Sequence, residues 1–229
     1  MYPIVLDIAT APLPDAASYL DTPRAPRNYK DPAKIDLYIQ EKMVEDLADA
    51  ALDLDLARIT AIGLYDTQHG DIDQSDFQTL NILCLRTERD EREALKDIGH
   101  LLQPDSLTLI RPIVTFNGFE FDLPILMRRA MYLGVPFPKL NIKYQSPHID
   151  LAAELADHNP KRRRRSLSFY VRRLGWSDLI KPLDGAEEAR VFETGDWDKL
   201  MGAVAHDLRA TARLAKWKGL LTVPTAGHP

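Results

Sequence analysis

Residues 115–126 read Thr-Phe-Asn-Gly-Phe-Glu-Phe-Asp-Leu-Pro-Ile-Leu and join two elements of different kinds. The apolar run from Pro112 to Phe116 is typical of a buried strand. The pattern from Phe121 to Leu133, closed by Gly134, is typical of a helix. Asp122 therefore opens a helix directly after a strand.

Two other aspartates stand in comparable places. Asp7 closes an apolar strand expected from Pro3 to Ile8, and Asp207 lies within a long helical pattern. Because clustered carboxylates repel one another, a site that contains several of them usually holds hard cations such as Mg²⁺ or Mn²⁺. Two such ions about 3.5–4 Å apart can clamp the attacking and leaving oxygens of a phosphodiester. Taken singly, each aspartate also fits a strand end, a helix cap or an exposed helix position.

Hydrophobic patterns along the rest of the chain predict an α/β fold with a mixed sheet. Strands are expected at residues 3–8, 58–65, 80–85, 112–116 and 147–151. The polar turn between the second and third strands favours an antiparallel meander, whereas helices between the later strands favour parallel pairing. Helices are expected at residues 32–52, 87–102, 121–133, 166–174 and 196–217, with a loop containing Pro182, Asp184-Gly185 and Gly195 between the last two.

The composition favours one globular domain. The chain has 229 residues, is 45% hydrophobic and carries a net charge of −5. We expect a single domain at residues 1–221, with a helical insertion at about 15–52 and a frayed tail at 222–229. The single cysteine, Cys84, excludes a disulfide framework and a cysteine-rich zinc site. No apolar run is long enough to cross a bilayer, so the expected protein is cytoplasmic and without a membrane partner.

Three motifs, in order, resemble those of the DEDD superfamily of 3'-5' exonucleases. Residues 115–126 resemble the second motif in the form found in family B DNA polymerase proofreading domains. Residues 5–10, Val-Leu-Asp-Ile-Ala-Thr, resemble the first motif, and residues 204–211, Val-Ala-His-Asp-Leu-Arg-Ala-Thr, resemble the third. Together with His148-Ile149-Asp150-Leu151 and Ser166-Leu167-Ser168-Phe169, they extend the resemblance to polymerase-B-like 3'-5' exonucleases over nearly the whole chain.

The resemblance implies a ribonuclease H-like fold with a five-stranded sheet flanked by helices, a pair of Mg²⁺ or Mn²⁺ ions, and removal of nucleotides from a 3' end. By position, Asp7 would bridge both metals, Asp207 would hold the metal that activates the attacking water, and Asp122 would support the second metal through water. Thr10, Asn117 and Phe121 are candidates for binding the nucleic acid. Asn117 is alternatively a turn residue, and Phe121 alternatively a core residue.

Two positions depart from the family pattern. Ala9 stands where the first motif has a glutamate that would ligate a metal, and Ala203 stands where the third has a tyrosine that would orient the attacking water. A misplaced water costs orders of magnitude in rate, so impaired hydrolysis is expected. His206 is a candidate substitute base, or simply a polar helix residue. The alanines fit either a natural pseudonuclease or a deliberate inactivation.

A basic run precedes the helix expected from Ser166. Its five adjacent cations are Lys161, Arg162, Arg163, Arg164 and Arg165. In an acidic protein, such a run beside a nuclease site can bind successive phosphates with salt-dependent affinity, although most charge runs are only solvated surface. Tyr170 is either a base-stacking or a core aromatic residue.

These observations leave three hypotheses. The first is a metal-dependent exonuclease, of full or impaired activity, acting on single-stranded DNA or the 3' ends of DNA, with RNA not excluded. The second is a catalytically inactive module that keeps the fold and binds nucleic acid. The third, an unrelated α/β domain with accidental motifs, does not predict that Asp7, Asp122 and Asp207 converge.

Overall fold

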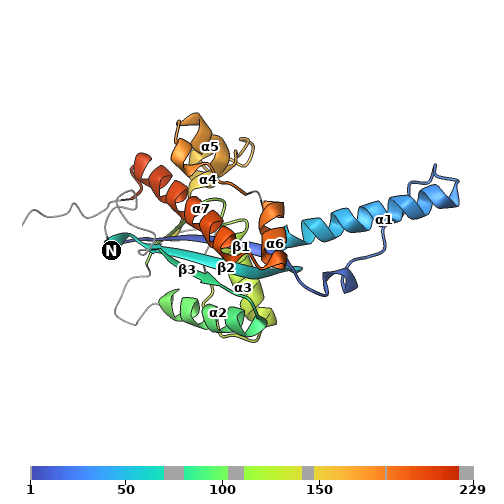
Figure 1. The fold of residues 1–229 in the computed structure, drawn as a ribbon. Helices are drawn as coiled ribbons and strands as arrows, with labels where there is room; N and C mark the ends of the chain where they lie inside the picture. Colours follow the sequence, from blue (N-terminus) through green and yellow to red (C-terminus); the bar gives the residue numbers. More distant parts are fainter. Residues whose placement is uncertain (1, 70–79, 103–110, 141–146, 184, 222–229) are drawn as a thin grey trace, which may run out of the picture.

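A five-stranded mixed sheet forms the centre of the molecule (Figure 1). The computed structural model describes residues 2–69, 80–102, 111–140, 147–183 and 185–221. The spatial order is β3-β2-β1-β4-β5, in which β1 pairs antiparallel with β2, and β2 with β3, while β4 pairs parallel with β1 and β5. The strands are β1 (Ile4–Pro12), β2 (Ala57–Asp66), β3 (Asn81–Cys84), β4 (Ile113–Thr115) and β5 (Ile149–Asp150). The predicted fold class is confirmed.

Helices cover both faces of this sheet. α7 (Trp197–Trp217) crosses one face, and α2 (Glu88–Leu102) and α3 (Asp122–Tyr132) pack on the other (Figure 1). The shorter helices are α4 (Leu151–Leu155), α5 (Leu167–Arg173) and α6 (Gly185–Thr194). Within β1, Leu6 and Ile8 join the core under α2 and α3, whereas Val5 and Ala9 join the core under α7. The two-residue period of a strand therefore turns Asp7 toward α7.

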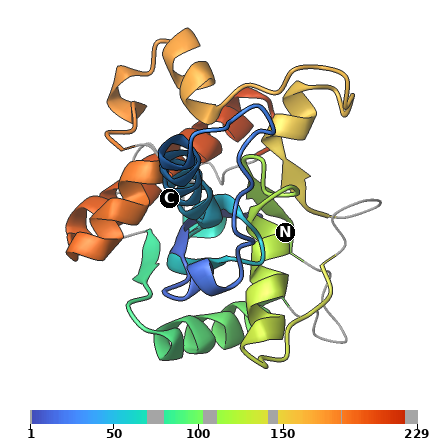
Figure 2. The same cartoon turned by 90° about the vertical axis from the view of Figure 1, so that its right-hand side faces the viewer.

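The predicted insertion at residues 15–52 contains a projecting helix, α1 (Pro32–Asp49), followed by a short turn of 3-10 helix at Ala50–Leu52. Asp31 caps α1 by accepting a hydrogen bond from the Ala33 N–H at 3.0 Å. None of the residues of α1 is buried. The helix extends away from the sheet in Figure 1 and points toward the viewer in Figure 2. None of the described helices is long and apolar enough to cross a membrane.

Two sequence predictions need correction. The first strand does not end at Ile8, because β1 continues to Pro12 and pairs there with Ala57. β4 pairs with β1 only at Ile4 and Val5. Among the described residues, the edge of β1 that faces away from β2 therefore has no strand partner beyond Val5, and a proline there removes no hydrogen bond between strands. The expected loop before the last helix is in fact occupied largely by α6.

The close approach of α7 to the sheet depends on a glycine opposite Asp7. Gly63 is the β2 partner of Asp7. A Cβ atom at Gly63 would lie 2.5 Å from Val204 Cγ1 and 2.6 Å from Leu208 Cδ1, both on α7. Since Asp207 is adjacent to Leu208 in sequence, the missing side chain of Gly63 sets how near Asp207 comes to Asp7.

We expect Gly63→Ala to lower the free energy of unfolding by about 1–3 kcal/mol, because the added methyl group overpacks the contact between β2 and α7. Urea unfolding followed by circular dichroism measures this change. The matched control is Gly202→Ala in α7, where a Cβ meets nothing within 4 Å; it should stabilise the protein by up to about 1 kcal/mol because alanine favours a helix. Equal effects of the two substitutions would contradict this account of Gly63.

Candidate active site

The three motif aspartates come from separate elements and lie within electrostatic reach of one another. Asp7 is in the middle of β1, Asp122 is the first residue of α3, and Asp207 is on α7. The charges of Asp207 and Asp122 both act on Asp7, and the charge of Asp207 also acts on Asp122. The unrelated-domain hypothesis did not predict this convergence.

Two residues that were absent from the sequence-based site complete the cluster. Glu188 enters from α6 and is 7% exposed. The ammonium group of Lys181 makes ion pairs with both Glu188 and Asp207. Lys181 follows the 3-10 turn Ser177–Leu179, and Glu188 lies in the segment that the sequence analysis assigned to a loop, so only the spatial arrangement reveals them.

Burial and the repulsion of neighbouring carboxylates make Asp7 and Asp122 reluctant to ionise. Burial raises the pKa of Asp7 well above its ordinary value, and the charges of Asp207 and Asp122 raise it further, while Lys181 lowers it. Burial also raises the pKa of Asp122 to about 7, against the opposing effect of backbone hydrogen bonds at Asp122 and Ile8. Burial lowers the pKa of Lys181, but the charges of Asp207, Glu188 and Asp7 outweigh it, so the lysine stays an ammonium. The cluster therefore favours a bound cation or proton.

Asp150 organises the turn that leads to Asp122. Its carboxylate is 1% exposed and accepts hydrogen bonds from the backbone N–H groups of Asn117 at 2.8 Å and Phe119 at 3.2 Å, besides capping α4 through Ala152 N–H at 2.9 Å. Asn117 has a φ of 64°, a left-handed conformation that asparagine tolerates. These contacts fix Asn117 as a turn residue, and its role in binding nucleic acid stays a prediction.

The basic run lies beside this turn, and a groove between α5 and α7 contains Asp207. Arg164 Nη1 donates to Asn117 Oδ1 at 3.4 Å and pairs with Glu120 Oε1 at 3.2 Å. All five cations of the run are exposed, and Arg162 pairs with Asp157. The groove has a volume of about 440 Å³ and is lined by Leu167, Ser168, Arg172, Lys181, Pro182, Leu183, Glu187 and Asp207. The positive charge of Arg172 on α5 and the negative charge of Asp207 on α7 thus border the same groove.

Phe169, rather than Tyr170, is the accessible aromatic side chain on α5. Phe169 is 41% exposed, and the Arg165 guanidinium lies 5.0 Å from the centre of its ring. Tyr170 is half-buried and packs edge-on against Phe116 at 6.1 Å between ring centres. Phe121 packs partly buried against the core under α3. Both Tyr170 and Phe121 therefore make the packing contacts of core residues.

The other candidate positions have mainly structural contacts. Thr10 is 6% exposed, and its hydroxyl donates to the Ala51 carbonyl at 2.6 Å. Ala9 is 2% exposed, and Ala203 is fully buried at 0%. His206 is half-buried beside Asp207, and burial lowers its pKa, which keeps the imidazole neutral as a base requires. Roles of Thr10 and His206 at the site stay predictions.

The chemistry of the acidic cluster fits a hard divalent cation, because its polar atoms are carboxylate oxygens. Two of its carboxylates already bind a positive charge, the Lys181 ammonium. Its arrangement is closed around that ammonium: within the described ranges, no three His, Cys, Asp or Glu side chains are placed so that they could hold a metal ion as they stand. A metal would therefore require the carboxylates and the lysine to move.

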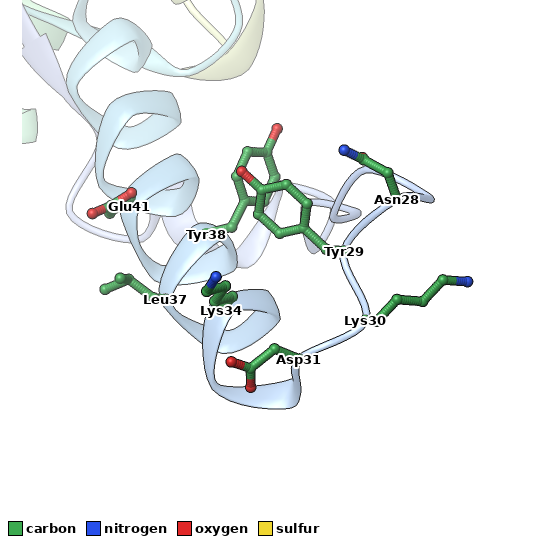
Figure 3. A pocket seen from close by; sticks show the side chains of 8 residues that line it. All are labelled: Asn28, Tyr29, Lys30, Asp31, Lys34, Leu37, Tyr38 and Glu41. Atoms are coloured by element: carbon green, nitrogen blue, oxygen red, sulfur yellow. The ribbon is translucent and has the colours of Figure 1, made fainter.

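A second hollow, of about 520 Å³, lies between the N-terminal half of α1 and the segment that precedes it, and none of the three aspartates lines it. Tyr29 packs edge-on against Tyr38 there, with 5.7 Å between ring centres (Figure 3). It is lined by Asn28, Tyr29, Lys30, Asp31, Lys34, Leu37, Tyr38 and Glu41. Both charge signs border it and no motif residue does, so it adds nothing to the candidate active site.

Comparison with known proteins supports the fold. A family model described as the RNase H superfamily matches residues 50–218, well over half of the chain. The solved structure of the family B DNA polymerase from the hyperthermophilic archaeon Pyrobaculum calidifontis matches with a TM-score of 0.56 and 17% identity, over 95% of this chain and 24% of the polymerase. The chain thus spans about a quarter of that polymerase, and the likeness at this identity is one of fold. No curated protein matches the chain.

The raised pKa of Asp122 predicts a pH-dependent stability. The folded protein keeps the Asp122 proton up to about pH 7, whereas an aspartate ordinarily loses it near 3.8. Since the folded state binds more protons between these values, the free energy of unfolding falls as pH rises through this window and then levels. Asp122→Asn removes the ionisation, so its melting temperature relative to the unmodified protein should rise by a few degrees between pH 4 and pH 8. Thermal unfolding in EDTA measures this.

Asp36→Asn, at an exposed position on α1, controls for the loss of one carboxyl group. A melting-temperature difference for Asp122→Asn that stays constant from pH 4 to pH 8 would refute the raised pKa.

Proposed function

The chain belongs to the RNase H superfamily, and on this premise we propose that it is a 3'-5' exonuclease-type protein that binds the 3' ends of DNA and hydrolyses them with impaired activity. The observation that carries the proposal is the convergence of Asp7, Asp122 and Asp207 from three elements next to a basic surface. RNA is the second substrate class of this proposal.

In this proposal, different residues bind the phosphates, a base and the metal. Arg164, Arg165 and Arg172 would bind backbone phosphates and direct the strand end along the groove to Asp207. Phe169 would stack on a base because its ring is exposed beside these cations. A divalent cation, when held by Asp7, Asp207 and Asp122, would supply charge stabilisation at the phosphodiester. In our proposal, Mg²⁺ or Mn²⁺ serves as that cation.

A second candidate function, nucleic-acid binding without hydrolysis, is favoured by a specific contact. The Lys181 ammonium already neutralises Asp207, and Ala203 carries no hydroxyl group that could orient water. A protein with this site would hold a 3' end through its basic surface alone. The two functions share their binding surface and differ in the chemical step.

We expect the protein to shorten a 5'-labelled single-stranded oligonucleotide slowly from its 3' end with Mn²⁺ or Mg²⁺, and not with EDTA. Asp7→Asn should lower that rate by about 100-fold or more, because the charge developing on the phosphate loses its stabilisation. Denaturing gels that resolve single nucleotides measure both rates, with Asp36→Asn on α1 as the control. Tight binding with no shortening in any metal would refute hydrolysis and leave the binding function.

We expect Phe169→Ala to weaken binding of the same oligonucleotide by about 1–3 kcal/mol in EDTA, because a stacking platform is lost. The dependence of log affinity on log salt should not change, since Phe169 is neutral, whereas Arg165→Ala should reduce that slope by about 0.7. Fluorescence anisotropy over a salt series measures both effects. Tyr19→Ala, at a 64% exposed aromatic residue outside the groove, is the control; an equal loss of affinity in that variant would contradict a stacking role for Phe169.

A further inference from the structure

Position 9 lacks the carboxylate that its motif leads one to expect, but another carboxylate reaches the same cluster. α6 lies against the exit of β1, where Ala189 packs with Ala11 and Ala51. Small side chains on β1 allow this helix to approach closely. Glu188, next to Ala189, is thereby held at 7% exposure within reach of Asp7, on which its charge acts.

Lys181 shows that Glu188 and Asp207 reach a common cation. One ammonium group pairs with a carboxylate oxygen of each residue, and its side chain is 16% exposed. Burying a charge is costly unless partners compensate it, so the two carboxylates together stabilise a positive charge at this point. The structure thus contains a cation position with ligands from α6 and α7, near β1.

We propose that Glu188 is the fourth acidic ligand of the cation site, taking the part that the motif assigns to position 9, and that the Lys181 ammonium occupies this position until a divalent ion displaces it. The inference rests on the proposed function, since it concerns the same site. It assigns Glu188 a direct role, and it makes Lys181 a competitor of the metal rather than its helper.

A purely structural role of Glu188 predicts the opposite result. If Glu188 only anchors Lys181, its removal loosens the competing ammonium and leaves the metal ligands intact, so metal affinity stays equal or increases. If Glu188 is a ligand, its removal lowers metal affinity even though Lys181 is released. The sign of the change therefore separates the two roles.

The experiment measures Mn²⁺ binding to the full chain without nucleic acid, by the electron paramagnetic resonance signal of free Mn²⁺. We expect Glu188→Gln and Asp207→Asn each to weaken Mn²⁺ affinity about 10-fold or more. We expect Lys181→Met to strengthen it several-fold. Glu193→Gln, an exposed glutamate on the same helix, should leave the affinity unchanged. Glu188→Asp, which keeps the charge on a shorter side chain, covers the case in which Glu188→Gln fails to fold, and should also weaken binding.

Unchanged or tighter Mn²⁺ binding in the folded Glu188 variants, with weaker binding in Asp207→Asn, would overturn the role of Glu188 and leave the proposed function standing. If neither Asp7→Asn nor Asp207→Asn changes Mn²⁺ binding, the cation site itself is absent, and both proposals fail in their metal-dependent part.

Discussion

The crowding of four acidic side chains around the middle of β1 is the constraint that organises this molecule. Asp7, Asp122, Asp207 and Glu188 come from four elements, and each of them loses hydration as the helices close over the sheet. Their repulsion must be compensated for the fold to hold together. The Lys181 ammonium compensates part of this charge by pairing with Glu188 on α6 and with Asp207 in the middle of α7, so these two helices are connected by charge as well as by apolar packing.

The sequence predicted the sheet and the aspartate cluster because both depend on local signals. Alternating apolar residues and turn chemistry located the five strands, and the strand-turn-helix segment around Asp122 is marked by Asn117 and Gly118, where a Cβ on Gly118 would collide with Thr115. The end of the first strand was misplaced because proline, which lacks a backbone N–H, is uncommon inside a sheet, and Pro12 follows shortly after Ile8. Only the sheet order explains why a proline is tolerated there, since β4 has already ended.

α6 and its glutamate were missed for a different physical reason. Asp184-Gly185 and Gly195 bracket a short segment whose charged residues obscure the apolar side of a helix. Its helical form depends on packing against β1, as Ala189, Val191 and Phe192 show. Tertiary contacts of this kind leave no periodic signal of sufficient length. The partners of Lys181 were hidden for the same reason, because ion pairs between distant segments depend on the complete fold.

Packing leaves little room for a larger side chain at either of the two buried alanines. Ala9 is 2% exposed and Ala203 is 0% exposed, so neighbouring side chains have closed over both positions. A single substitution that placed glutamate at position 9 or tyrosine at position 203 would meet packed atoms and lower the stability of the fold. The packing around these alanines therefore restricts both positions to small side chains, so any catalytic gain from a larger residue at either one would carry a cost in folding stability.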